Sequence, residues 1–485
     1  MRVASLLKPF QIIGGGTSGL TVARRLAANP AVSVAVIEAG GFYEIDNGNV
    51  SQIPNDAPQY SSPDPTSPIQ PSSYGAYQRW ADQVDDQTYT FDAILPYFQR
   101  SAHFTPPDYA KRGTDSEVSY NSTAFDPSGG PLQVSYTNYH QPIAAFVKRA
   151  YSSLGLLEIP GFNTGYLLGF SELTLTVDPR AATRSSSETS FLQEAISSTT
   201  LQVYQQTLAK KILIDEGKTA TGVSVVTAGT EYTLNAAREV ILAAGAIRSP
   251  QMLMISGIGP STVLEQYHIP VIVDAAGVGQ GMWDQPQYSL SYKVNVTTNS
   301  QLLVNPKFAL QATEDYLESQ TGPLGGGGAS WVGWEKLPSS LRRTLTNSTL
   351  ADVSQFPSDW PELEIVPQGA TSVPVPDSDN YASVLVALEM TTSRGNVTIT
   401  SADSQDNPLV SPNLLLSRTD QELAVQGLKR ARQVAMATGI TIGPEIAPGP
   451  DTQTDAQILE FIRQSVGPYY HVAATCKFQA FRRIG

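Results

Sequence analysis

Cysteine is almost absent from this chain, since Cys476 is the single one among 485 residues. One cysteine excludes an intrachain disulfide and any metal site built from several thiolates. Histidine is also scarce: the four residues are His103, His140, His268 and His471, with no close pair among them. The sequence therefore predicts no metal site.

The chain also lacks long apolar runs and an excess of positive charge. No run of eighteen apolar residues occurs, so no segment is expected to span a membrane. The 31 Lys and Arg are outnumbered by 44 Asp and Glu, which gives a formal net charge of −13. Because nucleic-acid binding depends on clustered cations, nucleic acid is not an expected partner. The length and a hydrophobic fraction of 41% indicate a globular protein of two domains or one large elaborated domain.

The sequence signals on localisation point in two directions. Five N-glycosylation sequons are compatible with secretion, and they begin at Asn49, Asn121, Asn295, Asn347 and Asn396. The stretch from Met1 to Lys8 is too short for a signal peptide before the first expected strand. Either the protein is intracellular, or its true N-terminus lies outside this sequence.

What the chain does have is a glycine motif near its start. An apolar run, Phe10 to Ile13, leads into glycines spaced as Gly14-x-Gly16-x-x-Gly19, and residues 21–28 have helical spacing. A second apolar run ends at Glu38, nineteen residues after Gly19. This order of strand, tight turn, helix, strand and acidic residue is typical of a βαβ dinucleotide-binding unit. Gly16 would let the backbone approach a pyrophosphate, and Glu38 would accept hydrogen bonds from a ribose.

Further along, the pattern changes several times. Residues 44–77 are rich in proline and predict a long irregular connection, followed by helices at 91–101 and 141–154. Short β segments at 201–205, 210–215, 222–227, 231–234 and 239–243 suggest a meander inserted in the nucleotide domain. A helix is expected to open at Ser249-Pro250. Residues 290–400 are expected to be mixed strand and loop, and 423–436 a surface helix with one buried stripe.

The middle of the chain carries a family resemblance. The stretch from Gly245 to Gly259 closely resembles the second signature of the glucose-methanol-choline (GMC) oxidoreductases, which are FAD-dependent. Other stretches are similar to members of the same family, and the fungal members, including those of secondary metabolism, are the most similar; these stretches are 161–165, 184–186, 201–204, 393–397 and 471–477.

The resemblance implies an α/β fold with two domains. One is a Rossmann-like FAD-binding domain with an inserted β meander, expected at 1–60, 176–290 and 467–485. The other is an α+β substrate-binding domain built on an antiparallel sheet, expected at 61–175 and 291–466.

The resemblance also implies roles for single residues. Thr17 and Ser18 would lie by the pyrophosphate of FAD, Glu38 and Ala39 by the adenosine ribose, and the backbone of Val203 by the adenine. Together with Gly14, Gly16 and Gly19 they form the expected cofactor site. His471 matches the family histidine that takes the hydroxyl proton of an alcohol while a hydride passes to the flavin. Imidazole suits this task because its ordinary pKa lies near neutrality.

The sequence departs from the family pattern in three places. A Gly-rich segment that covers the flavin is missing, and the Pro/Ser-rich run from Ser61 to Tyr74 stands in its position. The chain ends at Gly485, before the second His or Asn that partners the catalytic histidine in the family. The stretch from Trp283 to Pro286 replaces the family's Asp-His-Pro.

Three hypotheses follow from these matches and departures. The first is an FAD-dependent oxidoreductase acting on a primary or secondary alcohol, with His471 as base and a place in fungal secondary metabolism. The second keeps FAD but performs a non-redox cyclisation or dehydration. The third is a truncated, inactive family member.

Overall fold

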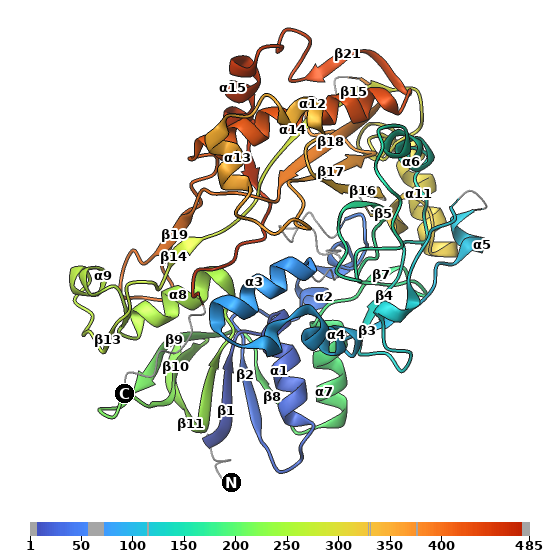
Figure 1. Cartoon of the computed structure of the whole chain (residues 1–485). Coiled ribbons are helices and arrows are strands. Elements are labelled where there is room, and N and C mark those ends of the chain that lie inside the picture. Colours follow the sequence, from blue (N-terminus) through green and yellow to red (C-terminus); the bar gives the residue numbers. More distant parts are fainter. Residues whose placement is uncertain are drawn as a thin grey trace.

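The computed structural model describes residues 7–56, 72–113, 116–327, 329, 331–374 and 377–477. Two large sheets organise the chain, one at the foot and one at the top of Figure 1, and helix α3 (Tyr74–Val84) lies between them in that view. The Pro/Ser-rich run from Ser61 lies outside the described residues as far as Pro71.

The lower sheet has the strand order β8-β2-β1-β11-β10-β9. β1 runs parallel to β2 and β11, β2 runs parallel to β8, and β9, β10 and β11 pair in antiparallel fashion. The strands are β1 (Leu7–Ile13), β2 (Val34–Ile37), β8 (Gln202–Tyr204), β9 (Thr207–Ile214), β10 (Ala220–Thr227) and β11 (Thr230–Leu242). β2, in the middle of the parallel strands, is apolar and buried at every position because both faces of this sheet are covered.

Helices pack against the two faces of the lower sheet. On one face, α1 (Thr17–Ala27) buries Leu20 and Ala23 against Ile12 and Val36, with η5 (Glu188–Leu192) and α7 (Gln193–Ser198) completing the layer. On the other face, Met252 of α8 (Gly245–Ile255) packs with Ile13 and with the meander strands. A βαβ unit and an inserted meander are thus both present.

One detail of the meander differs from the sequence prediction. The two strands predicted at 231–234 and 239–243 are wrong, because β11 runs through both without a break. Its first half pairs with β10 and its second half with β1, and Asn235 faces both Gly222 and Leu7. A Cβ at Gly222 would lie 2.5 Å from the Leu234 carbonyl oxygen, so glycine allows the close approach.

The helix predicted to open at Ser249-Pro250 also begins elsewhere. α8 starts at Gly245, so Pro250 lies inside it. Proline has no N–H to bond the carbonyl four residues earlier, which belongs to Ala246. The Thr475 hydroxyl donates to that carbonyl at 2.6 Å. The hydrogen bond from Thr475 therefore satisfies the carbonyl that Pro250 leaves without a partner, and it also attaches α8 to the segment around Thr475.

The upper sheet is antiparallel, with the order β21-β15-β18-β17-β16-β5 and β22 attached to β15. Its strands are β5 (Gly169–Glu172), β15 (Pro286–Val294), β16 (Trp331–Glu335), β17 (Leu363–Gln368), β18 (Asn380–Leu388), β21 (Thr441–Ala447) and β22 (Gly467–Pro468). Its inner face, with α6 (Ala144–Ser153), α14 (Arg418–Ala437) and α15 (Asp455–Ser465), forms the largest of the hydrophobic clusters found in the described residues.

Helix α14 is a core helix, so the predicted surface helix with one buried stripe is wrong. Leu423, Ala424, Leu428 and Ala431 have no exposed surface, and Arg430 is only 4% exposed. Arg430 stays charged inside because its Nε and Nη2 donate to both carboxylate oxygens of Glu335, at 2.7 and 3.0 Å. Arg430 is a charged residue on a buried face because it pairs with Glu335, and the spacing of apolar residues cannot predict such a pair.

The region 290–400 contains helices that the sequence prediction missed. They are α10 (Gln301–Val304), α11 (Pro306–Ser319), α12 (Ser339–Arg342) and α13 (Asn347–Val353). α11 starts where the Asn305 side chain accepts a hydrogen bond from the Phe308 N–H, with Pro306 in the first turn. Only Ala312 and Tyr316 of α11 are buried, so its apolar pattern is weak.

Shorter elements connect the two halves. The helices among them are α2 (Tyr43–Asp46), η1 (Gly48–Ser51), η3 (Gln87–Tyr89), α4 (Phe91–Gln99), α5 (Tyr109–Arg112), η4 (Ser122–Ala124), α9 (Ser261–Gln266) and η6 (Pro323–Gly325). The strands are β3 (Ala102–Phe104), β4 (Leu132–Val134), β6 (Val177–Asp178), β7 (Thr183–Arg184), β12 (Ile258–Gly259), β13 (Val273–Asp274), β14 (Gln280–Met282), β19 (Gly395–Thr398) and β20 (Leu409–Ser411).

α4 and α6 confirm the helices predicted at 91–101 and 141–154. The predicted fold class, a Rossmann-like unit with a meander plus an antiparallel second sheet, is confirmed. Within the described ranges, no helix combines the length and the apolar character that a membrane crossing requires.

Candidate cofactor and active site

The glycine motif forms the turn between β1 and α1, and its three glycines meet different demands. Gly14 has φ +109°, and a Cβ there would lie 2.4 Å from the Ala243 carbonyl oxygen. A Cβ at Gly19 would lie 2.0 Å from the Gly14 carbonyl oxygen. A Cβ at Gly16 would meet nothing within 4 Å. Gly14 and Gly19 thus serve the packing of strand and helix, whereas Gly16 leaves open space in front of the helix.

This open space faces the N-terminus of α1. Gly16 is the N-cap residue and offers no side chain to the helix, and the first turn contains no acidic residue. Thr17 and Ser18 in that turn are exposed. The first N–H groups of a helix have no partner within the helix and lie at the positive end of its dipole, so this turn suits a pyrophosphate.

Glu38, at the end of β2, closes the site on one side. Its Oε2 accepts a hydrogen bond from the Gly15 N–H at 2.6 Å, and its Oε1 accepts one from the Gly40 N–H at 2.8 Å. Val203, on β8, pairs with Val36 of β2. Gly15, Glu38 and Val203 line one small cavity of about 30 Å³.

Most of the other expected cofactor residues lie in the same turn, beside this cavity. Gly14, Gly16, Thr17, Ser18 and Gly19 are consecutive with Gly15 along the turn, and the exposed Ala39 follows Glu38. The open glycine turn, the uncapped helix and the carboxylate together fit a dinucleotide. Their contacts with a bound cofactor stay a prediction.

The cavity also has lining residues that the sequence did not single out. Phe42, Glu188, Leu192 and Gln205 are among them. Glu188 opens η5, a π-helix, and such irregular turns are frequent at functional sites. The stretch Arg184 to Ser186, noted for its family resemblance, ends two residues before Glu188 and was the available signal.

His471 lies on an extended segment that follows β22. Its side chain is exposed, and its backbone N–H donates to Asp284 Oδ1 at 2.9 Å. Trp283 and Ala473 form a backbone bridge, and the Gly279 N–H donates to the Thr475 carbonyl at 2.8 Å. The segment is therefore fixed along its length, although it belongs to no long strand.

The same segment comes close to the glycine turn. Thr475 bonds the Ala246 carbonyl in the first turn of α8, and the Ala243 N–H just before α8 donates to the Ile13 carbonyl of β1. Gly14 follows Ile13 and packs against Ala243. The carboxyl ends of β1 and β11 thus hold the predicted cofactor turn and Thr475, four residues after the predicted base, at one edge of the lower sheet.

A buried and a half-buried glutamate lie next to this segment and were not foreseen. The Tyr469 hydroxyl donates to Glu364 Oε1 at 3.1 Å, and the rings of Tyr469 and His471 have centroids 4.6 Å apart. Glu364 is 7% exposed and hydrogen-bonds the neighbouring Glu389. Burial raises the pKa of Glu364, and burial together with the charge of Glu364 holds the pKa of Glu389 well above its ordinary value. The pair therefore holds a proton more strongly than two solvated carboxyl groups would.

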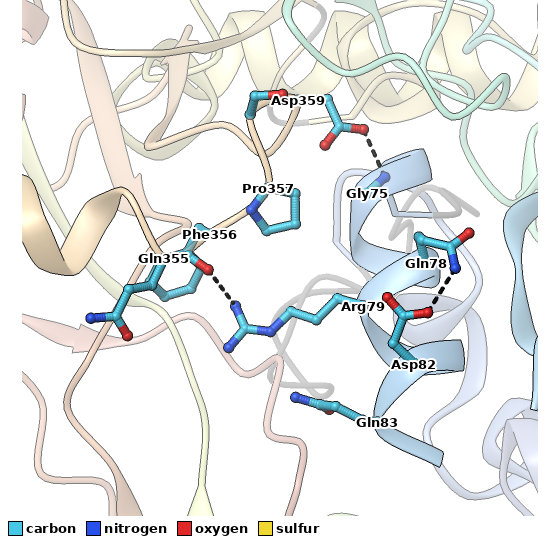
Figure 2. Close-up of a pocket in the computed structure, with 10 residues that line it drawn as sticks. Gly75, Gln78, Arg79, Asp82, Gln83, Gln355, Phe356, Pro357 and Asp359 are labelled. Atoms are coloured by element: carbon cyan, nitrogen blue, oxygen red, sulfur yellow. Dashed lines mark hydrogen bonds between the residues drawn. The ribbon is translucent and has the colours of Figure 1, made fainter. Parts of the chain in front are cut away.

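An open groove of about 900 Å³ separates α3 from the loop 355–359 (Figure 2). Arg79 reaches across it from α3, with its guanidinium carbon 5.2 Å from the centroid of the Phe356 ring. Farther along, the Gly75 N–H donates to Asp359 Oδ2 at 2.8 Å and closes that end. The Phe356 ring also contacts Trp283, at 6.1 Å between centroids, so the aromatic wall continues to the residue that pairs with Ala473.

A glycine turn on a parallel βαβ unit, joined to a second antiparallel sheet, defines a dinucleotide-binding α/β protein. Family models described as GMC oxidoreductase match residues 72–287 and 391–480. The chain belongs to the GMC oxidoreductase family, whose members are FAD-binding flavoproteins. The family predicted from the sequence is confirmed.

Individual relatives are fungal. A glucose methanol choline oxidoreductase of Aspergillus terreus is 45% identical, over 96% of this chain and 83% of its own length. Patulin synthase of Penicillium expansum is 40% identical over 96% and 82%, and versicolorin B synthase of Aspergillus parasiticus is 39% identical over 96% and 79%. A crystal structure of formate oxidase matches with a TM-score of 0.84 at 23% identity, covering 96% of this chain and 88% of that one, which supports the fold.

Proposed function

We propose that this protein is an FAD-dependent oxidoreductase that oxidises a primary or secondary alcohol in fungal secondary metabolism. The observation that carries the proposal is the meeting of the His471 segment with the glycine turn at one edge of the lower sheet. Hydride removal from an alcohol requires a base close to a bound dinucleotide, and the segment that carries His471 reaches the dinucleotide turn.

The residues divide the work as follows. The N-terminus of α1 and the turn at Gly16 hold the pyrophosphate, and Glu38 holds the ribose. FAD, when bound, supplies the acceptor for the hydride. A ring nitrogen of His471 takes the proton of the substrate hydroxyl, and the bond from the His471 backbone to Asp284 keeps this base in position. Glu364, linked to His471 through the Tyr469 ring and hydroxyl, stabilises the positive charge that His471 acquires.

The groove of Figure 2 is the proposed substrate entrance. It has an aromatic wall at Phe356 and polar groups along α3, which suits a substrate with flat rings and hydroxyl groups. The wall continues through Trp283 toward the segment of His471. Patulin synthase and versicolorin B synthase, among the relatives, bear names of fungal secondary metabolism.

A second candidate function keeps FAD but changes no oxidation state. It is motivated by versicolorin B synthase, which is almost as similar to this chain, at 39% identity, as patulin synthase is at 40%. Here the same scaffold would hold a polyketide-like substrate for cyclisation or dehydration.

One experiment separates these candidates. The purified protein is mixed anaerobically with a panel of aromatic and polyketide-derived alcohols while the flavin absorbance is recorded. Bleaching of the flavin by an alcohol is the expected result. A coloured protein that converts a substrate without bleaching, and to a product of unchanged oxidation state, would establish the second candidate. A protein that never takes up FAD would establish an inactive family member.

A further inference from the structure

Two glutamates meet at the rim of the predicted adenosine cavity. Glu188 of η5 lines the cavity, and Glu44 belongs to α2. Their carboxyl groups hydrogen-bond each other. One oxygen of each group, Oε2, is buried and accepts no hydrogen bond from any donor in the described part of the chain. Two carboxylates in contact without a donor require a proton between them.

The remaining contacts of Glu188 supply no positive charge. Its Oε1 accepts from the Gln193 amide of α7 at 2.9 Å. Among the charged groups on the elements around it, Arg24 of α1 forms an ion pair with Glu194, and Arg184 of β7 lies over the Tyr43 ring, 5.1 Å from its centroid. The nearby acidic groups are Glu38, which lines the same cavity, and Asp46 on α2.

These surroundings explain why the pKa of Glu188 is raised. Burial, followed by the hydrogen bond with Glu44, raises the pKa of Glu188 to about 8. Below that pH Glu188 keeps its proton and is neutral. Above it Glu188 carries a negative charge at the cavity that Glu38 also lines.

We propose that Glu188, with its proton shared with Glu44, is part of the adenosine site of the cofactor, and that loss of this proton weakens cofactor binding in alkaline solution. The inference rests on the FAD assignment of the proposed function and is independent of the reaction. With the proton in place, the Glu188 side chain adds no negative charge to a cavity that the Glu38 carboxylate already lines. Without the proton, the cavity wall repels an anionic ligand.

The test measures release of FAD from the holoprotein by the rise in flavin fluorescence on dilution, between pH 6 and pH 9. If FAD binds only the protonated pair, its dissociation constant rises about tenfold from pH 7 to pH 9, as linkage to one group of pKa about 8 requires. Glu188→Gln and Glu44→Gln each remove the shared proton, so both should flatten this dependence. Glu216→Gln, at an exposed turn of the meander, is the matched control and should behave as wild type.

The outcomes are distinguishable. Equal slopes in wild type and in both variants would overturn the inference, and a flat dependence in the wild type would do the same. If Glu188→Gln does not fold, Glu44→Gln alone decides. Wild-type protein without FAD at pH 6 overturns the cofactor assignment together with this inference. FAD-loaded protein whose flavin no alcohol reduces overturns only the proposed reaction.

Discussion

The backbone N–H of His471 donates to Asp284 Oδ1 at 2.9 Å, and this carboxylate is 5% exposed. Asp284 also accepts from the Gln285 N–H. We expect Asp284→Ala to release the His471 segment, so that alcohol-dependent flavin reduction falls at least tenfold while bound FAD stays near the wild-type amount. Asp284→Asn keeps an acceptor oxygen and should lose less. Stopped-flow flavin absorbance measures both, and equal rates for all three proteins would contradict the positioning role.

His471 itself should be needed for proton removal. His471→Gln keeps the size and polarity of the side chain but offers no base, so flavin reduction by an alcohol should slow by about 10² to 10⁴, the range of a lost general base. FAD content, read from the absorbance spectrum, should not change. His268→Gln, on the remote loop after α9, serves as the control. A full reduction rate in His471→Gln would assign the base to another group.

Two glycines of the dinucleotide turn should respond differently to the same substitution. Gly16→Ala adds a methyl group into open space, so the protein should fold with an unchanged melting temperature but bind FAD at least tenfold more weakly. Gly19→Ala drives its methyl group to 2.0 Å from the Gly14 carbonyl oxygen, so folding itself should suffer. Circular dichroism and FAD titration separate the two effects. Gly16→Ala protein with wild-type affinity would place the pyrophosphate elsewhere.

The hydrogen-bonded pair Glu364 and Glu389 should make stability fall as pH rises. The pKa of Glu389 is raised above its ordinary value of 4.5 in the folded protein, so the fold favours the neutral form. This stabilisation is complete below pH 4.5 and is lost as pH climbs through the raised pKa. Glu389→Gln stays neutral, and its melting temperature should fall less between pH 5 and pH 9 than that of the wild type. Parallel curves for wild type, Glu389→Gln and the control Glu216→Gln would contradict this.

Arg79 should affect substrate binding without affecting the chemistry. Arg79→Met keeps the apolar stem but removes the cation above Phe356. For the alcohol that reduces the flavin fastest, KM should rise roughly threefold to tenfold, because the variant offers no cation to a substrate ring, a contact worth about 0.5–1 kcal/mol, and no donor to a substrate hydroxyl. The value of kcat should stay within about twofold, because Arg79 is not part of the proposed proton path. Arg343→Met, on an exposed helix end, is the control, and equal KM values would exclude the groove as the entrance.

The sequence predicted the lower sheet well because its signals are local. Residues 10–13 and 34–37 form short, mostly apolar runs, and the glycine spacing marks the turn at Gly14 to Gly19. The errors arose where a distant partner decides the structure. β11 is continuous because β10 and β1 pair with its two halves, and α14 is buried because Glu335 neutralises Arg430.

The candidate site was predicted in part for the same reason. Glu38 and the glycines were predicted from a motif with fixed spacing, and Val203 from family resemblance. No sequence pattern predicts a role for Glu188, Glu364 or Glu389. Each is distinguished from other glutamates only by burial or by a contact with a residue far away in the sequence. The presence of a glutamate in the sequence does not indicate that its carboxyl group shares a proton with another.

The pairing of β1 with β11 also constrains how the chain folds. The Gln11 side chain donates to the Asn235 carbonyl across 224 residues of sequence, and β1 lies between β2 and β11. Contacts between such distant residues form slowly. At about 5–20 residues per second, the ribosome needs roughly 10–45 s to make the chain between these partners. During that time one edge of β1 has no native strand beside it, so a chaperone that covers this edge should raise the yield of cofactor-loaded protein.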